Sequence, residues 1–337
     1  MSPLFELTLT RLRLFFREPG AIFWTFGFPL VLSVALGIAF RNRPPEPVFV
    51  AVESAALQQQ LAPDGNLRVE LLDDAAARAA LRTGRASLVV LPGPPRTYLF
   101  DPTRPESRLA RVLTDDALQR AEGRRDPVMT IDQPVTEPGS RYIDFLIPGL
   151  IGMTLMQSGM WGIGYVVVEM RTRKLLKRLV ATPMNRAEFL FSFVLMRLAF
   201  LFLELPILVG FGWLAFSVGV AGSIGTLLLV AVLGALAFGG LGLLVASRAE
   251  NTQTAGGLIN AVMMPMFIGS GVFFSTQRFP AVVQPFLKAL PLTALNDALR
   301  GVMIDGAGLR ALARPIALLA GVAVVSFGIA LRVFRWR

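Results

Sequence analysis

Cysteine and histidine are both absent from this chain of 337 residues. Without cysteine there is no disulfide, no thiolate nucleophile and no thiolate-bound metal. Without histidine the chain also lacks the commonest metal ligand and the side chain that most often acts as a general base near neutral pH. We therefore expect neither a catalytic site nor a metal site.

Charged residues are scarce as well, at 17% of the chain, whereas 54% is hydrophobic and the mean hydropathy is +0.59. The apolar residues gather in runs of about 20, the length that crosses the hydrocarbon core of a bilayer. Because the first run is longer than the apolar core of a signal peptide, it is expected to be retained. The pattern predicts an α-helical polytopic membrane protein with six transmembrane helices, at 21–40, 143–168, 188–213, 223–246, 255–274 and 312–331.

Residues 41–141 differ from the rest, because charge and proline are frequent and apolar residues come in short clusters. Such clusters alternating with helical patterns predict a small α/β domain between the first and second spans. Strands are expected at 47–52, 66–72, 85–92 and 96–100, and helices at 55–61, 73–82 and 106–122.

Lysine and arginine indicate the orientation, since short loops rich in them stay in the cytoplasm. The N-terminus, the C-terminus, the 247–254 turn and above all the 169–187 loop carry most of them, so both termini are predicted to be cytoplasmic and the 41–141 domain extracytoplasmic. Residues 1–20 contain an amphipathic stretch that predicts a cytoplasmic interfacial helix, the alternative being an extension of the first span. Most of the basic residues that give the net charge of +10 flank apolar spans. The expected partner is therefore a lipid bilayer, and no nucleic acid is expected.

Two segments of the 142–337 bundle stand apart from the spans. Residues 169–187 are strongly basic and lie between two long apolar runs. Residues 275–311 are apolar but interrupted by Pro280, Pro285 and Pro291. They predict one or two short helices in an external re-entrant segment, or a surface amphipathic helix.

Polar residues inside the predicted spans are candidate site residues, because a charge in hydrocarbon costs about 2.5–3.5 kcal/mol on insertion scales. Glu204 is the deepest, and Arg197 lies two helical turns before it on the same face. Gln157, Ser158 and Asn260 are the other polar candidates. Each of these residues could line a substrate path, or it could form a hydrogen bond that holds two spans together. The glycines of the second span have the same two readings, as substrate-facing or as packing residues.

Several stretches resemble the ABC-2-type permease family, the membrane subunits of type V ABC exporters. The basic loop of residues 169–187, which begins at Glu169 and runs to Ala181-Thr182-Pro183, resembles the family's coupling helix and is called the coupling segment. Pro265, the Ser270-Gly271 pair and two phenylalanines resemble the end of the family's fifth span. The chain departs from many relatives in lacking a glycine within Glu169-Met170-Arg171-Thr172-Arg173-Lys174. Further similar stretches are Leu290-Pro291-Leu292-Thr293-Ala294 with Asp297-Ala298-Leu299-Arg300-Gly301, and, as in the subgroup with a large loop after the first span, Gly84-Arg85-Ala86 and Asp101-Pro102-Thr103.

The resemblance implies a permease subunit of an ATP-driven exporter in the bacterial inner membrane, moving a hydrophobic or amphipathic substrate outward. It implies cytoplasmic ABC ATPase subunits and a second permease copy or paralogue as partners. No GxxxxGK[ST] loop occurs in the chain, so ATP and magnesium are expected on the ATPase and no cofactor on this chain. The residues expected to couple to the ATPase are Glu169, Arg171, Arg173, Lys174, Lys177, Thr182 and Pro183, although these cations could also serve only to set topology.

Other classes of function account for fewer of these features. A membrane sensor with an extracytoplasmic ligand domain would have a signalling module after the second span, where this chain has a short loop and four more apolar runs. An ATP-independent secondary transporter would show inverted repeats, and none is visible. A membrane-embedded enzyme would need several catalytic groups inside the spans.

The orientation can be tested by cysteine labelling, because the chain has no cysteine of its own. Leu175→Cys in the coupling segment should react with a membrane-impermeant maleimide only after spheroplasts are permeabilised. Asp64→Cys in the 41–141 domain should react in intact spheroplasts. Labelling of residue 175 from outside would contradict the predicted topology.

Overall fold

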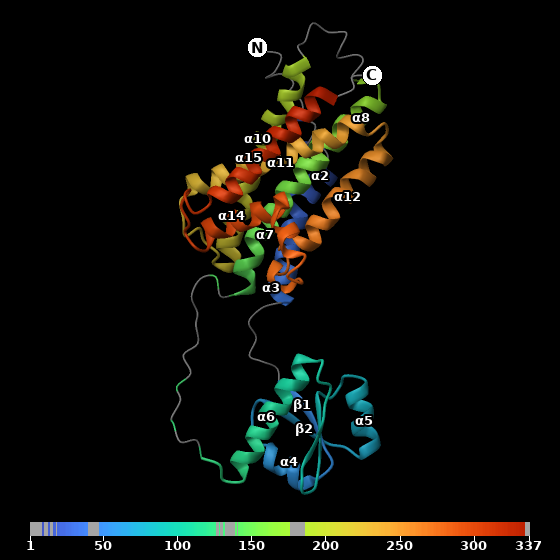
Figure 1. Cartoon of the computed structure of the whole chain (residues 1–337), viewed down its shortest axis with the longest axis vertical. Coiled ribbons are helices and arrows are strands. Elements are labelled where there is room, and N and C mark those ends of the chain that lie inside the picture. The colour runs from blue at the N-terminus through green and yellow to red at the C-terminus, as the bar shows by residue number, and fades with distance from the viewer. Residues whose placement is uncertain are drawn as a thin grey trace. The chain divides into compact units, whose positions relative to one another are not determined.

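The computed structural model describes residues 19–39, 47–125, 141–175 and 186–333, together with a few isolated positions. The chain divides into two compact units, one of residues 42–134 and one of residues 1–41 with 135–337 (Figure 1). The N-terminal stretch predicted to lie at the interface, and the predicted coupling residues Lys177, Thr182 and Pro183, fall outside the described residues.

The smaller unit is built on a four-stranded sheet in the order β2-β1-β3-β4. β1 pairs in parallel with both β2 and β3, whereas β4 pairs with β3 in antiparallel fashion. Short runs of Val and Leu form these strands, as branched side chains pack well on a pleated surface. The strands are β1 (Val48–Val52), β2 (Leu67–Leu71), β3 (Leu88–Leu91) and β4 (Thr97–Leu99).

Three helices cover the two faces of this sheet: α4 (Ala55–Leu61), α5 (Asp74–Arg82) and α6 (Pro105–Ala121). The Asp73 carboxylate accepts from Ala76 N at 2.7 Å and so caps α5. α4 and α6 pack on the face that carries Val50 and Val52, and α5 packs on the face that carries Ala51 and Val89 (Figure 1). The predicted α/β arrangement of these strands and helices is confirmed.

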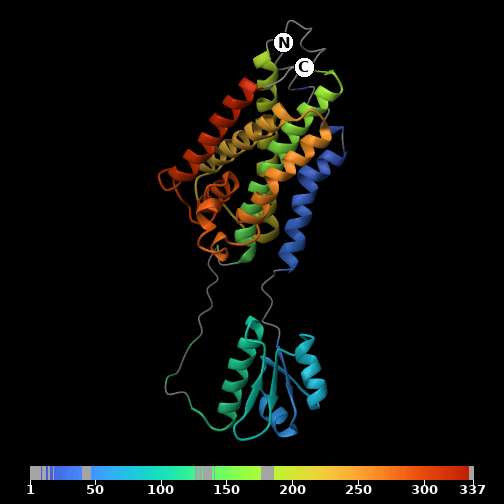
Figure 2. The same ribbon diagram turned by 45° about the vertical axis from the view of Figure 1, so that its right-hand side comes forward.

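The larger unit is helical throughout its described elements (Figure 2). Apolar helices occur at each of the six predicted spans, and short helices occur within 275–311. The elements are α2 (Pro19–Ile22), η1 (Phe23–Gly27), α3 (Phe28–Ala39), α7 (Tyr142–Gly159), η2 (Met160–Tyr165), α8 (Val166–Thr172), α10 (Arg186–Phe216), α11 (Ile224–Arg248), α12 (Thr252–Gly269), η3 (Thr276–Arg278), α13 (Gln284–Lys288), α14 (Pro291–Met303) and α15 (Ala313–Val333).

Among the residues that the structure describes, four helical stretches are long and apolar enough to cross a membrane. The helix at the first predicted span is not one of these four, because its apolar part, Thr25–Ala39, is shorter. α12 carries Thr252, Gln253 and Asn260, which lower its hydropathy, so it is not among the four. The helical membrane character is thus present, whereas the count of six spans stays a prediction. The four are Tyr142–Thr172, Phe191–Phe216, Ile224–Arg248 and Ala313–Val333.

α11 lies against α15, α7 and η2, at the centre of the helical unit. Glycines make this contact close: a Cβ added to Gly164 in η2 would lie 2.8 Å from the Gly242 carbonyl oxygen of α11. A Cβ at Gly242 would in turn lie 2.6 Å from the Gly159 carbonyl oxygen. Backbone-to-backbone approach of this kind requires residues without side chains. These glycines therefore act as packing residues, one of the two readings given for the glycines of the second span.

α14 in the predicted re-entrant segment is almost wholly buried by protein. It packs against α7, α11 and α15. Such burial satisfies the requirement that a broken, proline-containing segment be shielded by other helices. Its helical structure agrees with the sequence, and its depth in a membrane stays a prediction.

Two neighbouring glycines of η2 offer a matched test of the close packing. Gly164→Ala should lower the unfolding midpoint of the purified protein, because overpacking a tight contact costs about 1–3 kcal/mol. Gly162→Ala should leave it unchanged or raise it slightly, because a Cβ there would meet nothing within 4 Å. Equal midpoints for the two variants, measured by thermal unfolding in one detergent, would contradict the packing role of Gly164.

Candidate functional site

A buried ion pair lies within α10. Arg197 Nη1 donates to Glu204 Oε2 at 2.8 Å, and the side chains are 5% and 1% exposed. Seven residues separate the two, so a long arginine side chain extends along the helix to reach the carboxylate. The pair compensates the two charges inside an apolar helix. An isolated carboxylate there would be far more costly.

The pair also contacts a second helix through Ser158 of α7. The Ser158 hydroxyl lies 3.4 Å from Glu204 Oε1 and 2.8 Å from the Thr154 carbonyl oxygen. Since a hydroxyl has one proton, the shorter bond to Thr154 is the dominant one and the contact with Glu204 is weak. The arrangement favours the reading of Glu204 as a group that holds α10 against α7.

The arginine is not fully satisfied by the protein. Arg197 Nε and Nη2 are buried and have no hydrogen-bond partner among the described residues. A buried donor without an acceptor destabilises the fold unless water reaches it. The pair is therefore sensitive to any change that removes its one strong bond.

The remaining polar candidates lie elsewhere. Gln157 of α7 is half-buried, and Asn260 of α12 is exposed at the surface of the chain. Met264 and Ile268 of α12 are exposed as well. The structure thus divides the candidates into a connected group, made of the buried Arg197 and Glu204 with the half-buried Ser158, and two residues outside it. The sequence had no means of separating them.

At the start of the coupling segment, Arg171 bonds within the chain. Its Nη1 donates to the carbonyl oxygens of Ala246 at 2.8 Å and Ala249 at 2.7 Å. These carbonyls lie at the C-terminal end of α11, where a cation is favourable. Arg171 therefore joins α8 to the junction between α11 and α12.

The other described cations of the coupling segment face outward. Arg173 Nη2 donates to Glu169 Oε1 at 2.7 Å, in an exposed pair that contributes little to stability. Lys174 is exposed and has φ 57°, the left-handed conformation in which helices commonly end. α8 ends there, and the charges of Arg173 and Lys174 are accessible at its end.

A polar cluster at the other end of α7 was not identified from sequence. Asn296 of α14 donates to the Ser270 carbonyl oxygen at 2.9 Å, and Arg300 Nε donates to the Phe145 carbonyl oxygen at 3.2 Å. Arg300 also bonds to the Gly271 carbonyl oxygen and lies 3.6 Å from the centre of the Phe145 ring. Gly271 has φ +70°, which suits glycine at the turn after α12. The signal was the sequence similarity of the 265–274 and 290–301 stretches, which this cluster brings together.

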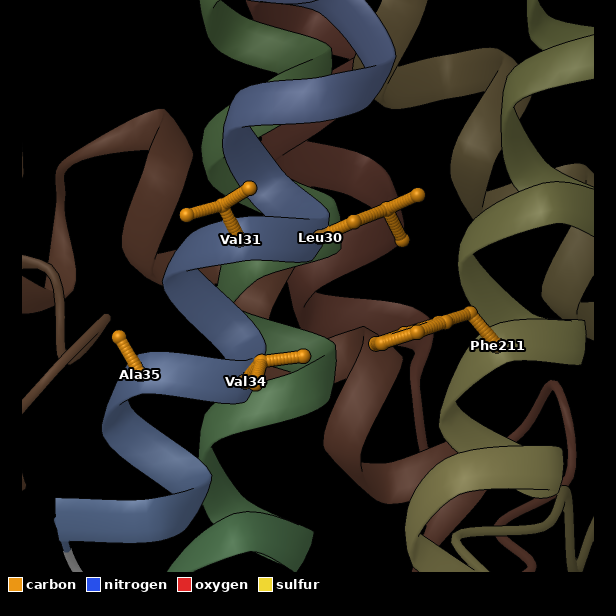
Figure 3. A pocket seen from close by; sticks show the side chains of 5 residues that line it. All are labelled: Leu30, Val31, Val34, Ala35 and Phe211. Atoms are coloured by element: carbon orange, nitrogen blue, oxygen red, sulfur yellow. The ribbon is translucent and has the colours of Figure 1, made fainter.

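An apolar hollow of about 340 Å³ lies between α3 and α10. Five side chains line it, and none of them carries a polar group (Figure 3). Such a surface suits hydrocarbon, because it has no donor or acceptor to orient a polar molecule. The lining residues are Leu30, Val31, Val34, Ala35 and Phe211.

Metal chemistry has no candidate here. Over the part of the chain that the structure describes, no three Asp or Glu side chains gather as a possible metal site.

The ion pair can be tested by a double-mutant cycle. Glu204→Gln should lower the free energy of unfolding by about 3 kcal/mol, because it leaves the Arg197 charge buried and unpaired. Arg197→Met should be destabilising for the corresponding reason. Arg197→Met with Glu204→Gln should lose less than the sum of the two, as measured by unfolding in detergent. Additive losses would show that the two side chains do not depend on each other.

The chain matches the family model described as "ABC-2 family transporter protein" over residues 19–332. It is also 30% identical over 207 residues to "ABC transporter G family member 20" of Dictyostelium discoideum. That alignment covers 60% of this chain and 28% of the relative, so the chain spans well under half of the relative's length. Because the family model covers nearly the whole chain, the protein belongs to the ABC-2 family of transporter membrane proteins.

Proposed function

We propose that this chain is the permease subunit of an ATP-driven exporter in a bacterial inner membrane, with both termini in the cytoplasm. It works with cytoplasmic ABC ATPase subunits, which bind ATP and magnesium, and with a second permease copy or a paralogue. The observation that carries the proposal, beside family membership, is the bond between Arg171 and the end of α11. It connects the coupling segment to the junction between α11 and α12.

An ATPase can act on a membrane only through an element that transmits displacement. α8 is continuous with η2 and α7, and Arg171 bonds it to the α11–α12 junction. A force applied near Lys174 therefore reaches three helices at once. Rigid movement of packed helices is a common way for a small displacement to become a large one.

The exposed cations at the end of α8 are proposed to bind the ATPase. Arg173 and Lys174 present positive charge, and Lys177, Thr182 and Pro183 extend the same segment. Arg171 has a different part in this scheme, because its guanidinium already bonds to carbonyl groups of its own chain. It positions the segment, and its neighbours make the contact.

The substrate path is proposed to run between two permease copies. Asn260, Met264 and Ile268 of α12 are exposed on a single chain and offer a mainly apolar wall with one polar group. Methionine side chains adapt to irregular apolar partners. A hydrophobic or amphipathic substrate fits such a wall, as it does the apolar hollow beside α3.

One observation favours ATP-independent secondary transport as the alternative. Buried charged residues inside apolar helices often mark ion or proton paths, and Arg197 with Glu204 is such a pair. The two functions differ in their energy source, which a reconstituted system can separate.

The test uses vesicles that contain the purified chain, with or without an ABC ATPase that co-purifies with it from the membrane. Efflux of a fluorescent amphipathic dye should require both the ATPase and ATP. Arg173→Glu with Lys174→Glu should abolish co-purification of the ATPase and reduce efflux by about tenfold or more, since reversed charges at a contact cost several kcal/mol. The matched control is Arg248→Glu, which changes an exposed cation at the end of α11 and should retain both ATPase binding and efflux.

Full efflux by the permease alone, driven by an ion gradient, would contradict the proposal and support secondary transport. Unchanged ATPase binding in the Arg173→Glu, Lys174→Glu variant would limit these cations to a role in topology.

A further inference from the structure

β2 is the end strand of the sheet in the α/β unit, with β1 on one side. Within residues 47–125 no strand pairs with its other side. An unpaired strand edge can accept another strand, and proteins usually protect it with charges or cover it. The side chains on β2 therefore indicate which partner, if any, it suits.

The backbone of β2 has a defined open edge. Asn66 accepts from Val48 N at 2.8 Å, and Leu72 N donates to the Val52 carbonyl at 2.9 Å. Since alternate residues of a parallel strand bond to the same neighbour, Arg68 and Glu70 direct their backbone groups to β1. Leu67, Val69 and Leu71 direct theirs to the open edge. The Leu67 N–H already donates to the Asp64 carbonyl at 3.1 Å, which leaves the Leu67 carbonyl available.

The order of side chains on β2 is complementary to itself when reversed. In an antiparallel pair of two β2 strands centred on Val69, Arg68 of each copy lies opposite Glu70 of the other. Leu67 of each copy lies opposite Leu71 of the other, on the other face. Leu71 is 46% exposed in the single chain, so it has apolar surface to bury. Each opposite pair is of a kind that stabilises sheets.

The backbone geometry agrees with this centre. Val69 would exchange two hydrogen bonds with Val69 of the second copy, and each Leu71 N–H would donate to the available Leu67 carbonyl. Arg68 and Glu70 would then form the pairs without backbone bonds, in which opposite side chains lie closest. A register shifted by one residue would place charged side chains opposite apolar ones.

The charges on this strand have a matching arrangement. Arg85 donates to both carboxylate oxygens of Glu70 at 2.9 Å, and the pair is exposed. Arg68 lies 6.0 Å from the centre of the Phe49 ring and has no ion-pair partner among the described residues. The carboxylate of a second copy would supply that partner. Phe49, Arg68, Glu70 and Arg85 together line a shallow hollow on this side of the sheet.

We propose that the α/β units of two copies of this chain associate through antiparallel pairing of their β2 strands about a two-fold axis at Val69. The pairing extends the sheet across both copies, and the two Arg68–Glu70 pairs determine its register. It rests on the proposed function only in that two identical permease copies must be present together. Charges of one sign would protect an edge against any partner, whereas opposite charges placed symmetrically about Val69 attract a second copy.

The first measurement is cross-linking of the full-length protein in membranes, which is simple because the chain has no cysteine. Val69→Cys should form a dimer on addition of a mild oxidant or a short bifunctional maleimide. Leu71→Cys should cross-link far less, because the two copies of residue 71 would lie about 13 Å apart along the strands. Thr97→Cys, on the strand at the opposite edge of the sheet, should not cross-link.

The second measurement tests the charges in the Val69→Cys background. Arg68→Glu alone and Glu70→Arg alone should each reduce the cross-linked fraction by about tenfold, because each places like charges opposite one another twice. The two variants are then co-expressed with different tags. In a mixed dimer of Arg68→Glu with Glu70→Arg, each opposite pair of positions 68 and 70 again contains one acidic and one basic side chain. Cross-linking between the differently tagged copies should return, which excludes misfolding as the cause of the loss.

The outcomes separate this inference from the proposed function. If the purified protein is dimeric by light scattering but Val69→Cys does not cross-link, the strand pairing is wrong and the paired permease stands. If the cross-link forms but single charge reversals leave it unchanged, the register is wrong. If the protein is a monomer, or pairs only with a paralogue, the proposal is overturned together with the homodimer. Cross-linking of Val69→Cys to another protein of the cell, and not to a second copy of this chain, would also overturn the proposal.

Discussion

The close contact of η2 with α11 is the constraint on which the helical unit depends. Gly159 and Gly164 meet Gly242 at distances that admit no Cβ, so the two backbones approach directly. In hydrocarbon such packing replaces the hydrophobic effect as the force that joins helices. α8 continues from η2, and α15 and α14 pack on α11. The position of each depends on this one contact.

Polar groups then bind the ends and the middle of the same helices. Arg171 binds the end of α11, Arg197 pairs with Glu204 beside α7, and Asn296 and Arg300 bind the turn after α12. Each arginine bonds to backbone carbonyls or to a carboxylate, and these partners are what an apolar helix bundle can offer a cation. The three sites lie at different levels of the bundle and join the continuous α7, η2 and α8 to neighbouring helices along their length.

The α/β unit is stabilised in the way that domains surrounded by water are. Its strands alternate between two covered faces, α4 and α5 begin at the side-chain caps Ser54 and Asp73, and the Glu70–Arg85 ion pair is exposed. All four strands and all three helices of this unit agree with the sequence prediction to within a few residues, because period and turn residues are local signals. Helical stretches at the predicted spans were equally readable, since length and hydropathy are local too. The number of spans that cross a bilayer is a different quantity. α12 shows why, because its polar residues lower the hydropathy of a helix that lies at a predicted span.

The sequence by itself determined where the helices and strands form, which residues are apolar enough for lipid, and that Arg197 and Glu204 share a helix face. Only the tertiary structure decided what these residues contact. Arg171, read from the sequence as one cation among several, bonds to carbonyls 75 and 78 residues away. Arg300 and Asn296 join segments that no local pattern connects. The physical reason is that a side chain's partner depends on which helices pack together, and that packing is set by surfaces from distant parts of the chain.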